Sequence, residues 1–244
     1  KINMNFEKQS GLKRKLINQT LNLGKKILKK EELKFSEKII NFLCEKLVRK
    51  KIRNQFGGNL QAFVSGGGAL DQNIGEFLNA VGLPTLQGYG LTEASPVVSC
   101  NLPDFVKVES VGPPFRTNKV KIAEDGEILI KGENVMLGYW NLKEETEKVI
   151  KDGWLHTGDI GELDENNYLK ITDRKKDIIV NLGGDNISPS KLENILCLNE
   201  NIKQSFVYGD KKNYLVALIV SEKENSKEKI KLIIENINKS LTLI

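Results

Sequence analysis

The most informative stretch of the sequence is Gln87-Gly-Tyr-Gly-Leu-Thr-Glu93. Its glycines let the backbone approach a ligand, and the ring of Tyr89 between them can cover a purine. The hydroxyl of Thr92 suits a phosphate oxygen, and the carboxylate of Glu93 suits a divalent cation. A distant segment, Trp154-Leu-His-Thr-Gly-Asp159, ends in an aspartate that can accept both hydroxyls of a ribose. Together the two segments predict a nucleotide site.

The segments before this stretch predict an α/β architecture. Gln61-Ala-Phe-Val64 fits a short buried strand, Gly66 to Gly68 a turn, and Asp71 to Val81 a helix. Leu83 to Gln87 is then expected to be the next parallel strand, an order typical of nucleotide-binding α/β folds. Further upstream, apolar residues recur at helical spacing among lysines and predict amphipathic helices: Leu12, Leu16, Leu23, Ile27, Phe35, Ile39, Leu43 and Leu47.

The sequence then becomes rich in strand patterns. Lys119 to Ala123 and Glu127 to Ile130 flank Asp125-Gly126, which is a hairpin signal. A second hairpin is predicted around Asn166-Asn167, and Ile178-Ile-Val180 predicts a further strand. The two hairpins indicate a small β subdomain, which the strand Ile178-Ile-Val180 follows.

The C-terminal part mixes helix and strand signals. A helix is expected to start in Ser188-Pro-Ser-Lys-Leu-Glu193, where Ser190 and Glu193 stand at capping-box spacing. Ser205 to Tyr208 and Tyr214 to Val220 predict another hairpin. The lysine- and asparagine-rich tail is open between a helix and a poorly ordered segment.

Composition indicates a globular protein of one or two domains, with 244 residues, 39% of them hydrophobic and 28% charged. The apolar run Leu215 to Val220 is far shorter than the roughly 20 residues that cross a bilayer. Cys44, Cys100 and Cys197 are widely spaced, which argues against a disulfide framework or a zinc site. We expect buried structural cysteines, rather than a nucleophilic pair with His156, and a reduced, cytoplasmic setting.

Positive charge gathers at the start of the chain. Residues 1–60 carry 16 Lys and Arg against 5 Asp and Glu, whereas the whole chain carries a net charge of +5. A solvated helix face is the plain interpretation, and peripheral contact with the anionic inner face of a membrane is the alternative left open. Nucleic acid is not expected as a partner, because no groove-reading or aromatic-basic motif accompanies the charge.

Five segments, in this order, resemble the adenylate-forming superfamily, and most closely its long-chain fatty acyl-CoA ligases. They are Ser65-Gly-Gly-Gly-Ala-Leu70, Gly88 to Pro96, Gly132 to Tyr139, Asp152 to Asp164, and Asp173 to Asp177 followed by Asn181 to Pro189. The resemblance implies an α/β fold, in which part of a large domain, with a parallel sheet and a small β subdomain, precedes part of a small α+β C-terminal domain. The implied boundaries are 1–104 for the helical and α/β part, 105–173 for the β subdomain, 174–176 for a hinge and 177–244 for the partial C-terminal domain.

The resemblance also implies a two-step reaction, in which a fatty acid and ATP give acyl-AMP and pyrophosphate, and CoA then displaces AMP. Attack of a carboxylate on ATP brings like charges together, and Mg²⁺ is the natural counter-ion. Glu93 is expected to ligate Mg²⁺ and Thr92 to hydrogen-bond the α-phosphate, so that both act in catalysis. Asp159 would bind the ribose, with Arg174 as a second contact. The nucleotide-binding residues implied in this way are Gly67, Gly68, Ala69, Gly88, Tyr89, Gly90, Leu91, Thr92, Asp159 and Arg174.

Lys176 matches the position about which similar enzymes rotate the small domain between the two steps. Gly183 and Gly184 would then approach CoA, where the missing side chains leave room for its thiol arm. The plain alternatives are a charged linker for Asp173 to Asp177, a core ring for Tyr89 and a surface ion pair for Asp159.

Two features of the resembled family are not found in the sequence: a Ser/Thr/Gly-rich phosphate loop before Ser65 and a lysine segment at the C-terminus. We therefore expect a piece of a longer ligase that is inactive by itself. Two alternatives stay open, namely adenylation of an aryl or amino acid with a carrier-protein acceptor, and a noncatalytic AMP- or acyl-binding remnant. The sequence indicates neither the acyl chain length nor the oligomeric state.

Overall fold

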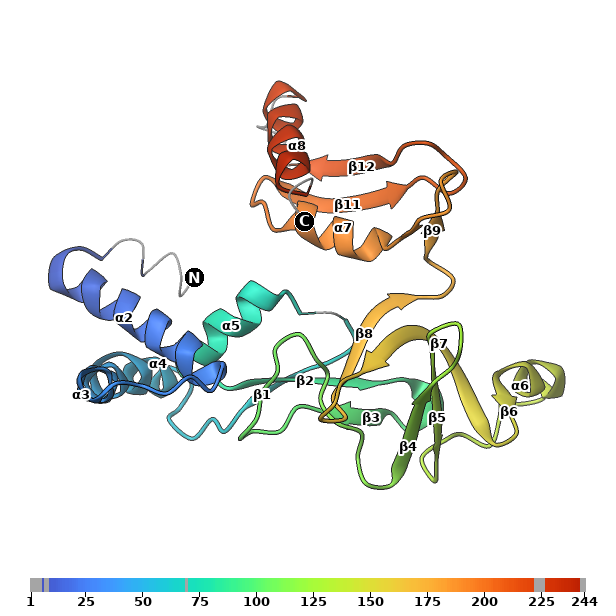
Figure 1. Ribbon diagram of the computed structural model, residues 1–244, viewed down its shortest axis with the longest axis horizontal. Helices are drawn as coiled ribbons and strands as arrows, with labels where there is room; N and C mark the ends of the chain where they lie inside the picture. Colours follow the sequence, from blue (N-terminus) through green and yellow to red (C-terminus); the bar gives the residue numbers. More distant parts are fainter. Residues whose placement is uncertain (1–5, 7–8, 69, 222–226, 242–244) are drawn as a thin grey trace. The chain divides into compact units, whose positions relative to one another are not determined.

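The computed structural model describes residues 6, 9–68, 70–221 and 227–241, which form two compact units (Figure 1). Each unit is assembled from separate stretches of the chain. The first takes in the chain up to Ala123, Leu129–Thr157 and Glu162–Ile171, and the second takes in Glu124–Ile128, Gly158–Gly161 and the chain from Thr172 onward.

A three-stranded sheet in the first unit carries the predicted strand, turn, helix and strand. β1 (Phe63–Ser65) pairs in parallel with β2 (Thr85–Gly90), and β3 (Val97–Cys100) pairs with β2 in the antiparallel sense. α5 (Gln72–Ala80) connects β1 to β2, and its N-cap Asp71 accepts a hydrogen bond from Ile74 N at 3.0 Å. The predicted order of elements is thereby confirmed.

The predicted amphipathic helices are also present in the first unit. α2 (Gly11–Leu28) is followed by α3 (Phe35–Cys44), which continues through the π-helical turn η1 (Glu45–Arg49) into α4 (Lys50–Asn54). Their inner faces help to form a hydrophobic core that contains Val48, Ile52, Val81 and Leu83.

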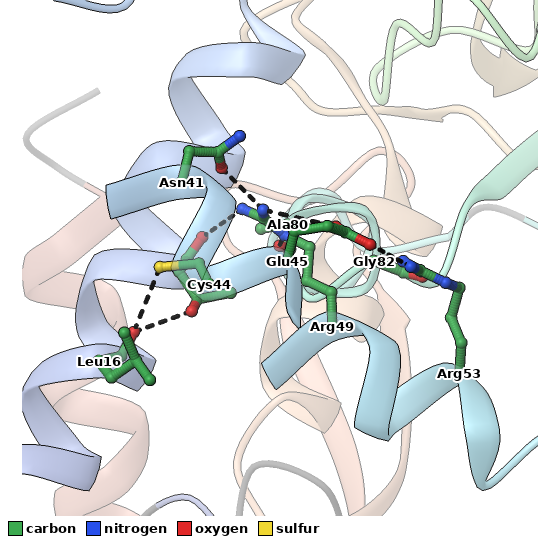
Figure 2. A network of polar contacts seen from close by, with 9 residues as sticks. Leu16, Asn41, Cys44, Glu45, Arg49, Arg53, Ala80 and Gly82 are labelled. Carbon is green, nitrogen blue, oxygen red and sulfur yellow. Dashed lines mark hydrogen bonds and ion pairs between the residues drawn. The ribbon is translucent and has the colours of Figure 1, made fainter. Parts of the chain in front are cut away.

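A buried arginine ties these helices together (Figure 2). Arg49 donates hydrogen bonds to Ala80 O at 2.9 Å, to Thr20 O at 3.1 Å and to Asn41 Oδ1 at 2.7 Å. Burial lowers the pKa of Arg49, and these acceptors compensate the guanidinium for the water it has lost. The arginine thus joins α2 and the long helix to the C-terminal end of α5.

A second sheet contains five strands in the order β4-β5-β7-β6, with β8 paired to β7. The two hairpins that were predicted around Asp125-Gly126 and Asn166-Asn167 are both present. Gly126 and Asn167 have φ values of 84° and 61°, which are typical of tight hairpin turns. The elements are β4 (Asn118–Ile122), β5 (Glu127–Gly132), α6 (Lys143–Val149), β6 (Ile150–Lys151), β7 (Trp154–Leu163) and β8 (Leu169–Arg174).

The second unit continues with strands and helices around its own core. β9 (Ile179–Val180) pairs with β10 (Asn186–Ile187), and β11 (Ile202–Tyr208) forms the predicted hairpin with β12 (Val216–Ser221). The tail forms a helix, α8 (Lys227–Leu241). Ile179, Leu196, Ile202 and Val207 form the buried core of this part.

The start of α7 (Pro189–Cys197) corrects one sequence prediction. Ser188, and not Ser190, is the N-cap, because its Oγ accepts a backbone N–H of the first turn at 3.2 Å. Pro189 takes the first helical position, where its fixed φ suits the helix and its missing N–H removes no hydrogen bond. Glu193 instead accepts from Val207 N at 2.8 Å. The predicted capping box of Ser190 and Glu193 is therefore wrong.

The cysteines differ in their surroundings. Cys44 is buried, Cys100 is partly buried and Cys197 is exposed. Burial raises the pKa of the Cys100 thiol. The expectation of buried structural cysteines is right for Cys44 and wrong for Cys197, the exposed last residue of α7. Across the described ranges, no helix is long and apolar enough to span a membrane.

Candidate nucleotide site

The glycine turn after β1 has open space where the sequence predicted a nucleotide contact. Gly67 has a φ of 81°, and a Cβ placed on Gly67 or Gly68 would have no heavy atom within 4 Å. Leu70 N donates to Gln87 Oε1 at 3.2 Å, so the end of the glycine turn is fixed to β2. Ala69 lies outside the described residues.

The glycines at the end of β2 are required by the packing of the chain itself. A Cβ on Gly90 would lie 1.8 Å from Pro96 O, and one on Gly88 would lie 3.2 Å from Ser99 O. Leu91 N donates to Pro96 O at 2.8 Å, which closes the turn that follows β2. Tyr89 is only 7% exposed, so most of its ring belongs to the core of the first unit. Adenine stacking on Tyr89 stays a prediction.

Glu93 is held by Tyr139, a residue for which the sequence predicted no role in the site. Thr92 and Glu93 begin the short 3₁₀ turn η2 (Thr92–Ala94), in which Thr92 is exposed. Tyr139 Oη donates to Glu93 Oε1 at 2.8 Å, and Met136 N donates to Glu93 O at 2.8 Å. The hydrogen bond to Glu93 raises the pKa of Tyr139, so the phenol remains a proton donor at neutral pH. Tyr139 thus fixes the carboxylate predicted to bind the metal.

The carboxylate of Glu93 keeps acceptor capacity for a cation, and magnesium binding by Glu93 stays a prediction. Mg²⁺ is usually bound through one or two carboxylates, and it keeps waters and substrate phosphates as its other ligands. A carboxylate that accepts one bond from Tyr139 retains lone pairs for a cation. Nearby, Asn134 Nδ2 donates to Ala94 O at 2.9 Å, while its buried Oδ1 has no hydrogen-bond partner among the described residues. No group of three or more His, Cys, Asp or Glu that could hold a metal occurs in the described part of the chain.

The second unit brings together the two residues predicted to bind the ribose. Asp159 is buried on β7, and its Oδ1 accepts from Arg174 Nε at 3.2 Å. Arg174 ends β8 with a side chain that is 72% exposed. In this ion pair Asp159 is buried and Arg174 faces solvent. Ribose binding by either residue stays a prediction.

The turn after β8 is held by Lys175, a second residue for which the sequence predicted no role in the site. Its Nζ donates to Asp125 Oδ2 at 2.6 Å and to Glu127 Oε2 at 3.1 Å, and its backbone N donates to Gly158 O at 2.8 Å. These hydrogen bonds raise the pKa of Lys175, and its ammonium lowers the pKa of Asp125. The neighbouring Lys176, predicted to be the hinge, is exposed in the same turn.

Gly183 and Gly184, predicted to approach CoA, lie in the exposed turn between β9 and β10. Gly184 has a φ of 87°, and a Cβ there would meet open space. The turn is closed by Asn181, whose Nδ2 donates to Asp185 Oδ2 at 2.8 Å and whose Oδ1 accepts from Asp185 N at 2.8 Å. Two hydrogen bonds thus close this glycine-containing turn, and its contact with CoA stays a prediction.

Comparison with known protein families defines the class of protein. Residues 17–140 match the model of the AMP-binding enzymes, and residues 176–243 match the model of the AMP-binding enzyme C-terminal domain. The chain therefore belongs to the AMP-binding, or adenylate-forming, enzyme family, as the sequence motifs predicted.

Similar curated proteins are CoA ligases, of which the chain spans only a part. Long-chain-fatty-acid–CoA ligase FadD15 of Mycobacterium bovis is 42% identical over 180 residues, which cover 74% of this chain and 30% of that protein. Long chain acyl-CoA synthetase 1 of Arabidopsis thaliana is 39% identical over 191 residues, covering 72% and 29%. 2-Succinylbenzoate–CoA ligase of Oceanobacillus iheyensis is 33% identical over 180 residues, covering 70% and 37%.

Solved structures of the same family share the fold. The O-succinylbenzoate coenzyme A synthetase of Bacillus subtilis in complex with ATP and magnesium superposes with a TM-score of 0.62 at 32% identity, covering 71% of this chain and 39% of that one. The same enzyme with its acyl-adenylate intermediate gives 0.64 at 28% identity, covering 77% and 43%. The predicted fold, an AMP-binding α/β part followed by an AMP-binding C-terminal part, is confirmed.

Proposed function

We propose that the chain is part of a long-chain fatty acyl-CoA ligase that works in the cytoplasm. The full-length enzyme would activate a fatty acid with ATP to acyl-AMP and then transfer the acyl group to CoA. The observation that carries this proposal is the carboxylate of Glu93, which Tyr139 holds at 2.8 Å on the turn after β2. The similarity to long-chain fatty acid–CoA ligases supports the same substrate class.

In the first step, two anionic reactants must approach each other, which costs several kcal/mol without neutralisation. Glu93 would hold Mg²⁺, which supplies the positive charge between the phosphates. The exposed hydroxyl of Thr92 would donate to the α-phosphate, and the open turn at Gly67 and Gly68 would receive the nucleoside. Tyr89 would offer one face of its ring to adenine, flanked by Gly88, Gly90 and Leu91.

In the second step, the C-terminal part would change its position about Lys176 and present Gly183 and Gly184 to the thiol arm of CoA. Asp159 and Arg174 would retain the nucleoside by accepting and donating hydrogen bonds at the ribose. In this proposal, residues 105–173 form the β subdomain, 174–176 the hinge and 177–244 the C-terminal part. The exposed turns at Lys176 and Gly184 support it.

The experiment uses the complete gene product and measures pyrophosphate release with ATP, magnesium and a long-chain fatty acid. Glu93→Gln keeps the shape of the side chain but removes its charge, so we expect a loss of at least about 100-fold in acyl-AMP formation. Glu165→Gln, which removes an exposed carboxylate from the β7–β8 turn, is the matched control. Equal rates in the two variants would refute the role of Glu93.

A second candidate substrate is an aryl acid, because 2-succinylbenzoate–CoA ligase is also among the similar proteins. A panel of fatty, aryl and amino acids, with CoA and a carrier protein as acceptors, separates the candidates. Preference for an aryl or amino acid would replace the fatty acid in the proposal. AMP binding without turnover of any acid would instead indicate a noncatalytic nucleotide-binding protein.

A further inference from the structure

Tyr139 and Glu93 connect two segments of the first unit that lie 46 residues apart in the sequence. Tyr139 Oη donates to Glu93 Oε1 at 2.8 Å, and both residues are partly buried. The same segments are also joined by two other hydrogen bonds. Met136 N donates to Glu93 O at 2.8 Å, and Asn134 Nδ2 donates to Ala94 O at 2.9 Å. The phenol hydroxyl is therefore not needed to join the segments, and its own effect falls on the orientation of the carboxylate.

The partner of Glu93 is a neutral hydroxyl, whereas the other carboxylate of the predicted site has a cationic partner. Asp159 is paired with Arg174 at 3.2 Å. Within the described ranges, no Lys or Arg forms an ion pair with Glu93. The hydrogen bond to Glu93 raises the pKa of Tyr139, so the proton stays on the phenol. The contact thus orients the carboxylate of Glu93 and leaves its negative charge in place.

Tyr139 is in turn held by α6 and the residue before it. Tyr139 N donates to Thr146 Oγ1 at 2.9 Å, and the same hydroxyl donates to Leu142 O at 2.9 Å. Thr146 belongs to α6, and Leu142 is the N-cap of this helix. These two hydrogen bonds fix the backbone from which the ring of Tyr139 extends. Because the phenol contacts Oε1 of Glu93, the other carboxylate oxygen is left to a cation.

We propose that Tyr139 is a positioning residue, which holds the carboxylate of Glu93 in the orientation that binds a divalent cation. Carboxylates that ligate metals are themselves hydrogen-bonded, and loss of the hydrogen-bonding neighbour weakens metal binding. A carboxylate that is already oriented also loses less freedom when the cation binds. This inference rests on the proposed function, in which Glu93 holds Mg²⁺.

The test measures Mn²⁺ binding to the complete gene product by electron paramagnetic resonance. The nucleotide is an ATP analogue with a methylene group between the α- and β-phosphates, so that no reaction follows. Tyr139→Phe removes only the hydroxyl, and we expect the dissociation constant for Mn²⁺ to rise at least about tenfold. In pyrophosphate release with ATP, the Mg²⁺ concentration that gives half the maximal rate should rise in the same way. The rate at saturating Mg²⁺ should fall by less than about threefold.

The matched control is Tyr168→Phe, which removes a hydroxyl that donates to Phe105 O at 2.8 Å in the same unit. This control should bind Mn²⁺ as the unchanged protein does, and circular dichroism checks the fold of both variants. Equal losses in the two variants, or unchanged Mn²⁺ binding in Tyr139→Phe, would overturn the proposal. If Tyr139→Phe does not fold, Thr146→Val decides, because it removes the acceptor of Tyr139 N. Weaker Mn²⁺ binding in Thr146→Val then supports the proposal, and unchanged binding overturns it.

Glu93→Gln separates a failure of this inference from a failure of the proposed function. Loss of Mn²⁺ binding in Glu93→Gln, with normal binding in Tyr139→Phe, would overturn the role of Tyr139 alone. Normal binding in both variants would overturn the metal role of Glu93 and the role of Tyr139 with it. The double variant should bind Mn²⁺ no more weakly than Glu93→Gln does, because Tyr139 acts through the carboxylate. A further loss would mean that the hydroxyl contacts the cation or the nucleotide itself, against a positioning role.

Discussion

At the scale of single residues, the glycines near the end of β2 serve the packing of the chain as well as any ligand. Gly90 is required because its backbone passes so close to Pro96 O that a Cβ would lie 1.8 Å away. A glycine that makes room for a ligand and a glycine that makes room for the chain look the same in sequence. The structure distinguishes them, since Gly68 faces open space.

Gly90→Ala should therefore lower the free energy of unfolding by at least about 2 kcal/mol, because the turn after β2 must open to admit a methyl group. Gly68→Ala places the same methyl group in open space, and it should change the free energy by less than about 0.5 kcal/mol. Urea denaturation followed by circular dichroism measures both. Equal effects of the two substitutions would show that the close approach to Pro96 relaxes without cost.

The residue types of the candidate site were predictable, whereas the side chains that hold them were not. Glu93 and Asp159 were selected because a carboxylate after a glycine-rich strand suits cations and hydroxyls. Tyr139 is 46 residues from Glu93, and Lys175 is 50 residues from Asp125. Such pairs depend on strands meeting in space, and a single sequence carries no local signal for them.

At the scale of elements, the first turn of α7 shows how proline decides where a helix begins. Ser188→Ala removes the side-chain acceptor of the N-cap, so it should cost about 1 kcal/mol in the free energy of unfolding. Ser190→Ala is the control, because Ser190 lies inside the helix, where alanine is favoured. Thermal unfolding of both variants measures the difference. A larger cost for Ser190→Ala would restore the capping box that the sequence predicted.

The ion pair of Lys175 with Asp125, in the turn after β8, should be detectable as a lowered pKa of Asp125 in an acid titration. Lys175 lowers the pKa of Asp125 in the folded chain, so the pair stabilises the fold above the unfolded-state pKa of about 3.9. That contribution is lost as the pH falls through the folded-state pKa. In Lys175→Met, NMR titration of the side-chain carboxyl of Asp125 should show a pKa back near its ordinary value.

The control for this titration is Lys170→Met, which removes a different ion pair, that of Lys170 on β8 with Glu162 on β7. It should leave the pKa of Asp125 low. A low pKa for Asp125 in Lys175→Met would mean that the backbone hydrogen bond from Glu127 N to Asp125 Oδ1, at 3.1 Å, is sufficient by itself.

The element order was predictable because its signals are local. The dipeptides Asp-Gly and Asn-Asn between strand patterns predict the hairpins. The N-cap Asp71 and the helical spacing of apolar residues predict α5. The π-helical turn η1 was not predictable. No local pattern in Glu45–Arg49 marks it, and the hydrogen bond of its last residue, Arg49, to Ala80 O joins segments that are far apart in the sequence.

At the scale of the whole molecule, Arg49 should matter for one unit only. Arg49→Met leaves Ala80 O and Thr20 O without their buried donor, so it should destabilise the first unit by about 3 kcal/mol. Hydrogen exchange read by mass spectrometry should rise in α2, α3 and α5 and stay unchanged in α7 and β11. Arg53→Met, which removes a partly exposed arginine of α4, is the milder control. Faster exchange throughout the chain would show that the two units unfold together.

The discontinuous make-up of the second unit bears on protein engineering. Arg174 and Lys175 belong to its C-terminal stretch, but their counter-charges Asp159, Asp125 and Glu127 sit on the earlier stretches 124–128 and 158–161. A chimera that takes only the chain after about residue 172 would contain Arg174 and Lys175 but not the carboxylates with which they form ion pairs. A fusion of this C-terminal part to another protein therefore needs residues 124–128 and 158–161 as well, or acidic residues at equivalent positions of that protein.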